Sequence, residues 1–116
     1  MTDEEIIERI ATGVMGWERI TWKGQDPDIP CWGYLDRDEI LVYKHTFDPL
    51  LDDNDCMAAW DKFSEDAELV LSFNGKRWSG EAFHGDGYVL GGADHEDRRR
   101  AMCEVMVMAT AKENER

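Results

Sequence analysis

Carboxylates are the most abundant chemically active side chains of this chain, and they are concentrated near its middle. Residues 48–68 contain eight Asp and Glu residues but one basic residue, Lys62. A row of carboxylates imitates the phosphate backbone of a nucleic acid, so it can occupy a protein cleft built for DNA or RNA. We therefore expect a protein-binding surface, called the acidic face below, that consists of Asp48, Asp52, Asp53, Asp55, Asp61, Glu65 and Asp66. The alternative is a solvated surface that only keeps the protein soluble.

Basic residues form two short clusters, which are the candidates for binding an anion. The guanidinium fork of arginine matches phosphate oxygens, and an aromatic ring can stack on a base. The clusters therefore predict, as an alternative to the acidic face, a nucleotide site that consists of Arg98, Arg99, Arg100, Lys76, Arg77 and Trp78. The competing interpretation is that these cations pair with the surrounding carboxylates.

The chain lacks the residue combinations of a catalytic site. Its serines lie in no GxSxG setting, and Cys56 and Cys103 fall on apolar helix faces, where thiols are usually inert. Carboxylates are so numerous that no single pair stands out as a general acid and base. We expect a protein without enzymatic activity and without catalytic residues.

Metal and cofactor motifs are absent as well. The segments 84–86, 94–97 and 52–55 carry suitable ligand types, but none has a spacing tied to a metal geometry. Residues 52–55 lack the central Gly and terminal Glu of an EF-hand loop. The glycines between 85 and 92 lack the Lys-Ser/Thr of a P-loop. We expect no metal site and no cofactor.

Size and charge narrow the class of protein. A chain of 116 residues forms one domain, residues 1–116, and 42% hydrophobic residues suffice for a core. The net charge of −13 repels free nucleic acid and attracts a basic protein surface. No apolar run reaches the roughly 20 residues of a membrane helix, the acidic start differs from a secretory signal, and the three cysteines form no CxxC. These features predict a cytoplasmic protein that binds neither membranes nor nucleic acid directly.

Two helices are expected in the first two thirds of the chain. The first covers residues 3–14, is capped by Thr2 with Glu5, and has one apolar stripe of Ile7, Ile10, Ala11 and Val14. The second follows Asp48-Pro49 and is capped by Asp53, Asn54 or Asp55. Its inner face consists of Cys56, Met57, Trp60 and Phe63.

Short segments rich in β-branched and aromatic residues predict strands at 18–23, 31–35, 39–44, 68–73, 76–83 and 88–90. Asn74-Gly75 predicts a type I′ hairpin turn, with positive φ at both positions. Gly91-Gly92 is expected to end the last strand. Helices and strands in this order predict the α+β class, with an antiparallel or mixed sheet packed with about three helices.

The third helix is expected to begin after a cap at Asp94 and to fray from Ala111 onward. Between Ala101 and Ala109 only Glu104 interrupts the apolar residues. A helix that is apolar almost all round is either deeply buried or covered on a second face by another subunit. The sequence thus leaves a homo-oligomer through this helix open.

Three blocks of sequence carry a resemblance to a known family. They are the first helix running into 14–17, the segment Phe47-Asp48-Pro49 followed by a polar run and Ala58-Ala59-Trp60, and the last helix with 100–103. In this order they resemble the phage ABA-sandwich domain family of small phage and prophage proteins. The resemblance implies an αβα sandwich and a phage origin, and it brings no functional residues with it. His95-Glu96-Asp97-Arg98 departs from the family, which has a Pro-Glu-Ala lead-in there.

These observations predict a small acidic phage protein that inhibits a nucleic-acid-handling defence complex of the bacterial host. The acidic face would dock on the lysines and arginines that otherwise hold phosphates. The alternatives are a protein that sequesters a nucleotide signal of the host defence, or a structural accessory protein of the phage.

Overall fold

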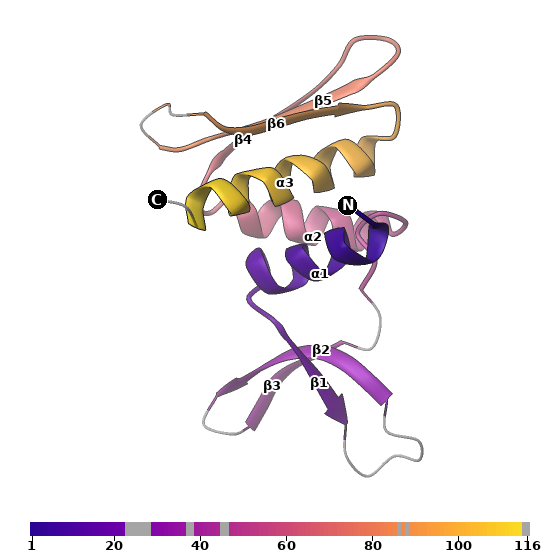
Figure 1. Ribbon diagram of the computed structural model, residues 1–116, viewed down its shortest axis with the longest axis vertical. Helices are drawn as coiled ribbons and strands as arrows, with labels where there is room; N and C mark the ends of the chain where they lie inside the picture. The colour runs from indigo at the N-terminus through magenta and orange to yellow at the C-terminus, as the bar shows by residue number, and fades with distance from the viewer. Residues whose placement is uncertain (23–28, 37–38, 45–46, 86, 88, 115–116) are drawn as a thin grey trace.

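The computed structural model describes residues 1–22, 29–36, 39–44, 47–85, 87 and 89–114, and side-chain burial for residues 1–18, 47–85, 87 and 89–111 of these (Figure 1). Its elements in chain order are α1 (Asp3–Gly13), β1 (Glu18–Trp22), β2 (Ile29–Asp36), β3 (Glu39–Lys44), α2 (Asp53–Phe63), β4 (Glu68–Phe73), β5 (Trp78–Phe83), β6 (Val89–His95) and α3 (Arg98–Asn114).

The strands form two three-stranded sheets, with the orders β1-β2-β3 and β4-β5-β6. Every pair of neighbouring strands is antiparallel, so the mixed arrangement that the sequence left open does not occur among the described strands. β1, β2 and β3 contact chiefly one another, whereas β5 and β6 also pack on α3.

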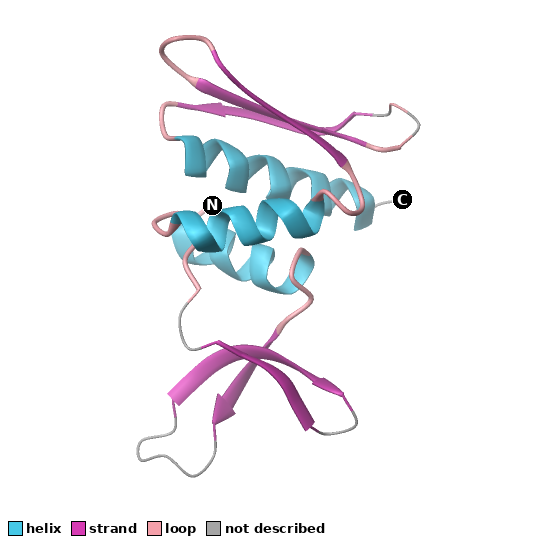
Figure 2. Cartoon of the chain, turned by 180° about the vertical axis from the view of Figure 1, so that it is seen from behind, coloured by secondary structure: helices cyan, strands magenta, loops and turns pink. Residues whose placement is uncertain are grey.

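Helix α3 is the centre of the fold. One of its sides covers β5 and β6, and α1 and α2 pack on the opposite side (Figures 1 and 2). All three helices thus lie on the same side of the β4-β5-β6 sheet. The predicted α+β class is confirmed: three helices are packed on a three-stranded antiparallel sheet.

The apolar residues of α3 are buried within one chain, so they need no second subunit to cover them. Its buried residues include Met102, Val105 and Met106, each 1% exposed or less, and its exposed large apolar residue is Met108. One copy of the chain therefore buries nearly all of the apolar surface of α3. The reason for expecting self-association through this helix falls away.

The caps of α1 and α2 differ in how well the sequence predicts them. Thr2 caps α1 as predicted, and its hydroxyl accepts the N–H of Glu5 at 3.2 Å. The cap of α2 is Asp52, one residue before the earliest position predicted.

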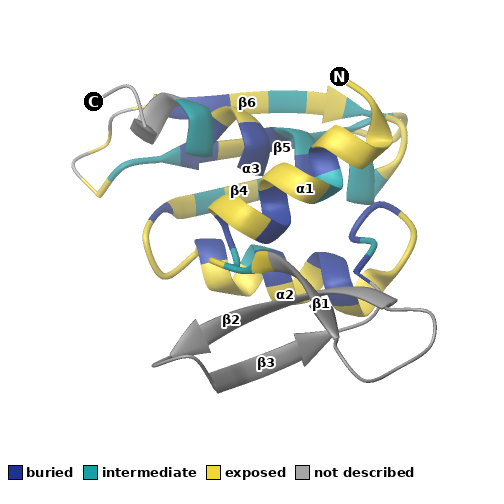
Figure 3. Ribbon diagram, turned by 60° about the horizontal axis from the view of Figure 1, so that its bottom comes forward, coloured by how far each residue is buried: buried dark blue, intermediate teal, exposed yellow. Residues whose placement is uncertain are grey.

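One residue of each predicted apolar face is less buried than expected. In α1, Ile7 is only half-buried, and Ile6, which was outside the predicted stripe, is buried instead. In α2, Met57 is 41% exposed. Figure 3 shows buried and exposed residues alternating along both helices, as expected for helices that bury one side.

The strands β4 and β5 pair as an antiparallel hairpin, as predicted. Leu69 lies opposite Ala82 and Leu71 opposite Gly80, while Phe73 stacks on Trp78 with ring centroids 4.7 Å apart. The turn itself differs from the prediction. The carbonyl oxygen of Arg77 accepts the N–H of Asn74, so these two residues flank the turn. The central residues are therefore Gly75, with φ +95°, and Lys76, instead of Asn74 and Gly75. Asn74 Oδ1 in turn accepts the N–H of Arg77 at 2.8 Å, so Asn74 closes the turn.

The last strand and the last helix are longer than predicted. β6 continues through Gly91-Gly92 to His95. Gly91 does not end the strand, because its lack of a side chain lets the strand pack closely on α3. A Cβ at Gly91 would lie 3.1 Å from Met108 Cβ of α3. α3 begins at Arg98, where Asp97 Oδ1, rather than Asp94, accepts the N–H of Arg99 at 2.9 Å. Its last turns include the residues from Ala111 to Asn114, which the sequence predicted as a frayed end.

Candidate functional site

Three carboxylates of the acidic face serve the folding of their own segment. Asp48 Oδ1 accepts the N–H of Leu50 at 3.1 Å, and Asp52 Oδ1 accepts the N–H of Asp55 at 3.1 Å. Asp55 is 9% exposed, and its Oδ2 accepts the N–H of Asp48 at 2.9 Å. The hydrogen bonds tie the turn before α2 to the first turn of the helix. Including Asp55 in a docking face was therefore wrong, since the carboxylate points into the protein's own backbone.

The apolar neighbours of these aspartates explain why the turn is needed. Phe47, Pro49 and Leu50 are all buried, and the Phe47 ring meets that of Trp17 edge-on at a centroid distance of 5.1 Å. Buried backbone N–H groups require acceptors, and the aspartates provide them. The polar run between two apolar anchors is thus a structural motif.

The start of α2 and the start of α3 form an ion-paired cluster. Arg98 donates to the Asp53 carboxylate, and Arg99 Nη1 lies 3.6 Å from the same oxygen. Arg99 also donates to the carbonyl oxygen of Leu51 at 2.8 Å. The two candidate sites of the sequence, one acidic and one basic, therefore meet here and partly neutralise each other.

The other two arginines of the predicted nucleotide site are paired as well. Arg100 donates to Glu104 Oε1 at 2.9 Å and to Asp3, and these two hydrogen bonds raise the pKa of Arg100. Arg77 donates to Asp94 Oδ1 at 2.9 Å, at the end of the sheet. All four arginines have carboxylate partners.

The aromatic member of that set, Trp78, is stacked on Phe73. The described residues near Lys76 provide no ion pair for its ammonium group. A nucleotide could bind these residues only if Arg77 and Arg98 to Arg100 exchanged carboxylates for phosphates. The arrangement therefore agrees with the competing interpretation, pairing with carboxylates.

The remaining carboxylates lie at the other end of α2. Asp61, Glu65, Asp66 and Glu68 are all exposed. Glu65 accepts from Lys62 Nζ at 3.1 Å, whereas the described part of the chain offers no ion pair to Asp61, Asp66 or Glu68. This group, called the carboxyl-end cluster below, is what remains of the acidic face as a surface open to a partner. Glu68, at the start of β4, belongs to the same run of eight carboxylates between residues 48 and 68.

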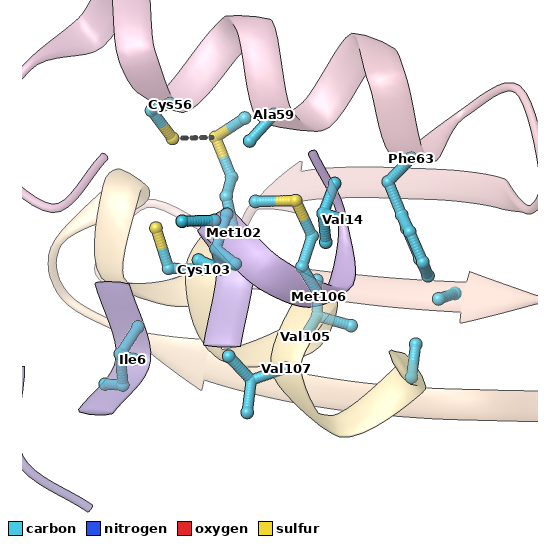
Figure 4. Packing of buried hydrophobic residues seen from close by; sticks show 14 of the residues in the cluster. Ile6, Val14, Cys56, Ala59, Phe63, Met102, Cys103, Val105, Met106 and Val107 are labelled. Atoms are coloured by element: carbon cyan, nitrogen blue, oxygen red, sulfur yellow. Dashed lines mark hydrogen bonds between the residues drawn. The ribbon is translucent and has the colours of Figure 1, made fainter. Parts of the chain in front are cut away.

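The sequence also missed an association of sulfur atoms. Cys56 Sγ lies 3.8 Å from Met102 Sδ, and the Cys103 side chain lies near them in the core (Figure 4). The interaction with Cys56 and the burial of the group raise the pKa of the Cys103 thiol. Both cysteines are buried, as predicted. Their proximity leaves no signal in the sequence, because it depends on how α2 lies on α3.

The described residues contain no group of three or more His, Cys, Asp and Glu side chains able to hold a metal ion. None of the described helices is both long enough and apolar enough to cross a membrane.

Comparison of the chain with protein-family models, with curated proteins and with solved structures yielded no match. The resemblance to the phage family accordingly stays a prediction.

Proposed function

We propose that this protein is a small acidic binding protein that docks on a basic surface of another protein, a surface of the kind that otherwise holds nucleic acid. The resemblance to phage proteins suggests where to look for the partner, namely among the nucleic-acid-handling defence complexes in the cytoplasm of a bacterial host. Binding there would inhibit the complex by occupying its phosphate-binding residues.

The observation that supports the proposal is the carboxyl-end cluster. Asp61 lies in the last turn of α2, where the helix dipole places partial negative charge. A carboxylate at this end is locally unfavourable, in contrast to Asp52 and Asp53 at the start of the helix. Asp66 and Glu68 add charge directly beyond it. Carboxylates that do not contribute to local stability are the ones available to a partner.

The charge of the whole chain supports the same proposal. With a net charge of −13, the protein attracts a basic surface over several ångströms and accelerates the encounter. Contacts between exposed charges are screened by salt, so binding should weaken steeply as salt is added. A partner that normally holds phosphates would also release the protein when nucleic acid is supplied.

The test is a capture experiment from bacterial lysate on the immobilised full chain, at low and at high salt, with duplex DNA or RNA as competing eluent. We expect captured proteins to elute with either competitor or with salt. Replacement of three residues of the cluster, Asp61→Lys, Asp66→Lys and Glu68→Lys, should lower the affinity of the purified partner about tenfold or more.

The matched control is Glu4→Lys, Glu8→Lys and Glu81→Lys, which changes the net charge equally at exposed sites outside the cluster. It should retain most of the affinity. Equal loss in both triple variants would show that bulk charge, not the cluster, causes binding. Capture that resists salt and both competitors would reject nucleic-acid mimicry, and no capture would favour a structural phage protein.

A further inference from the structure

Three sulfur atoms meet in the core between α2 and α3. Cys56, in the first turn of α2, places Sγ 3.8 Å from Sδ of Met102. Figure 4 shows the three side chains directed toward the same part of the core. None of them is more than 1% exposed. The association joins two helices through residues 46 and 47 positions apart.

We propose that Cys56, Met102 and Cys103 form a binding site for a soft monovalent metal ion, with Cu(I) as the ion that fits best. Thiolate and thioether sulfur are the ligands that select Cu(I), and the three side chains supply no oxygen or nitrogen. Structural zinc takes four ligands, and magnesium and calcium take oxygen. A set of three sulfurs therefore discriminates against the common divalent ions.

The separation of Cys56 Sγ and Met102 Sδ agrees with three-coordinate geometry. A metal–sulfur bond is about 2.3 Å long, so three sulfurs in a plane around the metal are about 4.0 Å apart. The separation of 3.8 Å between Cys56 Sγ and Met102 Sδ is within a few tenths of an ångström of this value. Methionine has three rotatable bonds and a polarizable sulfur, so Met102 can adjust to the ion without displacing a helix.

Metal binding would change the charge of this part of the core. On binding Cu(I), each thiol releases its proton to solvent, and two thiolates with one Cu(I) leave one negative charge in the core. The first turn of α2 contributes the positive end of the helix dipole. Burial keeps water away from the ion.

The test titrates the reduced full chain with Cu(I) without oxygen, in competition with the coloured Cu(I) chelator bathocuproine. We expect one Cu(I) per chain to be withheld from the chelator, with three sulfur neighbours at about 2.3 Å by X-ray absorption. Cys56→Ser should abolish this retention. Met102→Leu conserves volume and should lower the number of sulfur neighbours from three to two.

The control is Cys31→Ser, which removes the cysteine of β2 and should leave copper binding unchanged. Circular dichroism establishes that each variant is folded. If Cys56→Ser does not fold, the test rests on Met102→Leu, in which the number of sulfur neighbours of copper should fall from three to two. The proposal is overturned if bathocuproine removes all copper from the native chain, if Cys31→Ser loses the ion, or if Met102→Leu keeps three sulfur neighbours.

Discussion

Two aspartates of α2 have opposite surroundings although they lie on the same short helix. Asp55 is 9% exposed and its carboxylate accepts the N–H of Asp48, whereas Asp61 is exposed and has no ion pair among the described residues. The difference follows from the ends of the helix: the Asp55 carboxylate accepts the N–H of Asp48 in the preceding turn, while Asp61 lies beside the carbonyl end. Chemically identical side chains thus have a structural role at one end and are free to bind at the other.

At this scale we predict that Asp55→Ala lowers the free energy of unfolding by about 1–3 kcal/mol, because the N–H of Asp48 would lose its acceptor. The matched change Asp61→Ala should stay within about 0.5 kcal/mol of the native protein. Urea denaturation followed by circular dichroism measures both. Equal effects of the two substitutions would contradict the structural role of Asp55.

At the scale of elements, the fold depends on how closely α3 approaches the β4-β5-β6 sheet. Gly80 and Gly91 face the helix, and a Cβ at either position would come within 3.2 Å of a carbon of α3. At Gly91 the neighbours are Met108 Cβ and the backbone nitrogen of Ala109, which move only with the whole helix. Small residues on the sheet therefore set the distance between these two layers.

We predict that Gly91→Ala destabilises the protein by about 1–3 kcal/mol, since the added methyl group overpacks the contact with α3. The adjacent Gly92 is the control: it is exposed, and the nearest atom to its added Cβ is the carbonyl oxygen of Gly80 at 3.7 Å. Gly92→Ala should therefore be nearly neutral. Thermal unfolding of both variants checks the prediction, and a larger loss for Gly92→Ala would show that the sheet packs on its other face.

At the scale of the whole molecule, the described cations are largely occupied by carboxylates while the net charge remains −13. The excess negative charge repels itself in the folded state more than in the expanded chain. Exposed ion pairs contribute little to stability, so screening should chiefly relieve this repulsion.

We accordingly predict that added sodium chloride raises the temperature of unfolding. The variant with Asp61, Asp66 and Glu68 changed to Lys has a net charge of −7, because each reversal adds two positive charges. Since repulsion grows roughly with the square of the net charge, its response to salt should be about a third of the native one. Scanning calorimetry over a salt series measures both responses. A decrease in stability with salt would show that the ion pairs outweigh the repulsion.

The sequence by itself determined the features that depend on neighbours along the chain. The cap at Thr2, the existence of the β4-β5 hairpin, the strand at 39–44 and the α+β class follow from local hydrogen bonding and from the periods of helix and strand. The burial of Cys56 and Cys103 follows from the same periodicity. Such patterns hold whatever the tertiary arrangement.

Tertiary structure alone decided which charges are available and which residues meet. Nothing local indicates that Asp53 pairs with Arg98, that Asp55 turns inward, or that Cys56 lies beside Met102, because these contacts join residues brought together by the packing of α2 on α3. The same packing buried the apolar surface of α3 within one chain and let β6 continue through Gly91. The physical reason is that charge pairing and close contact depend on distance in space, which sequence spacing does not specify beyond a few residues.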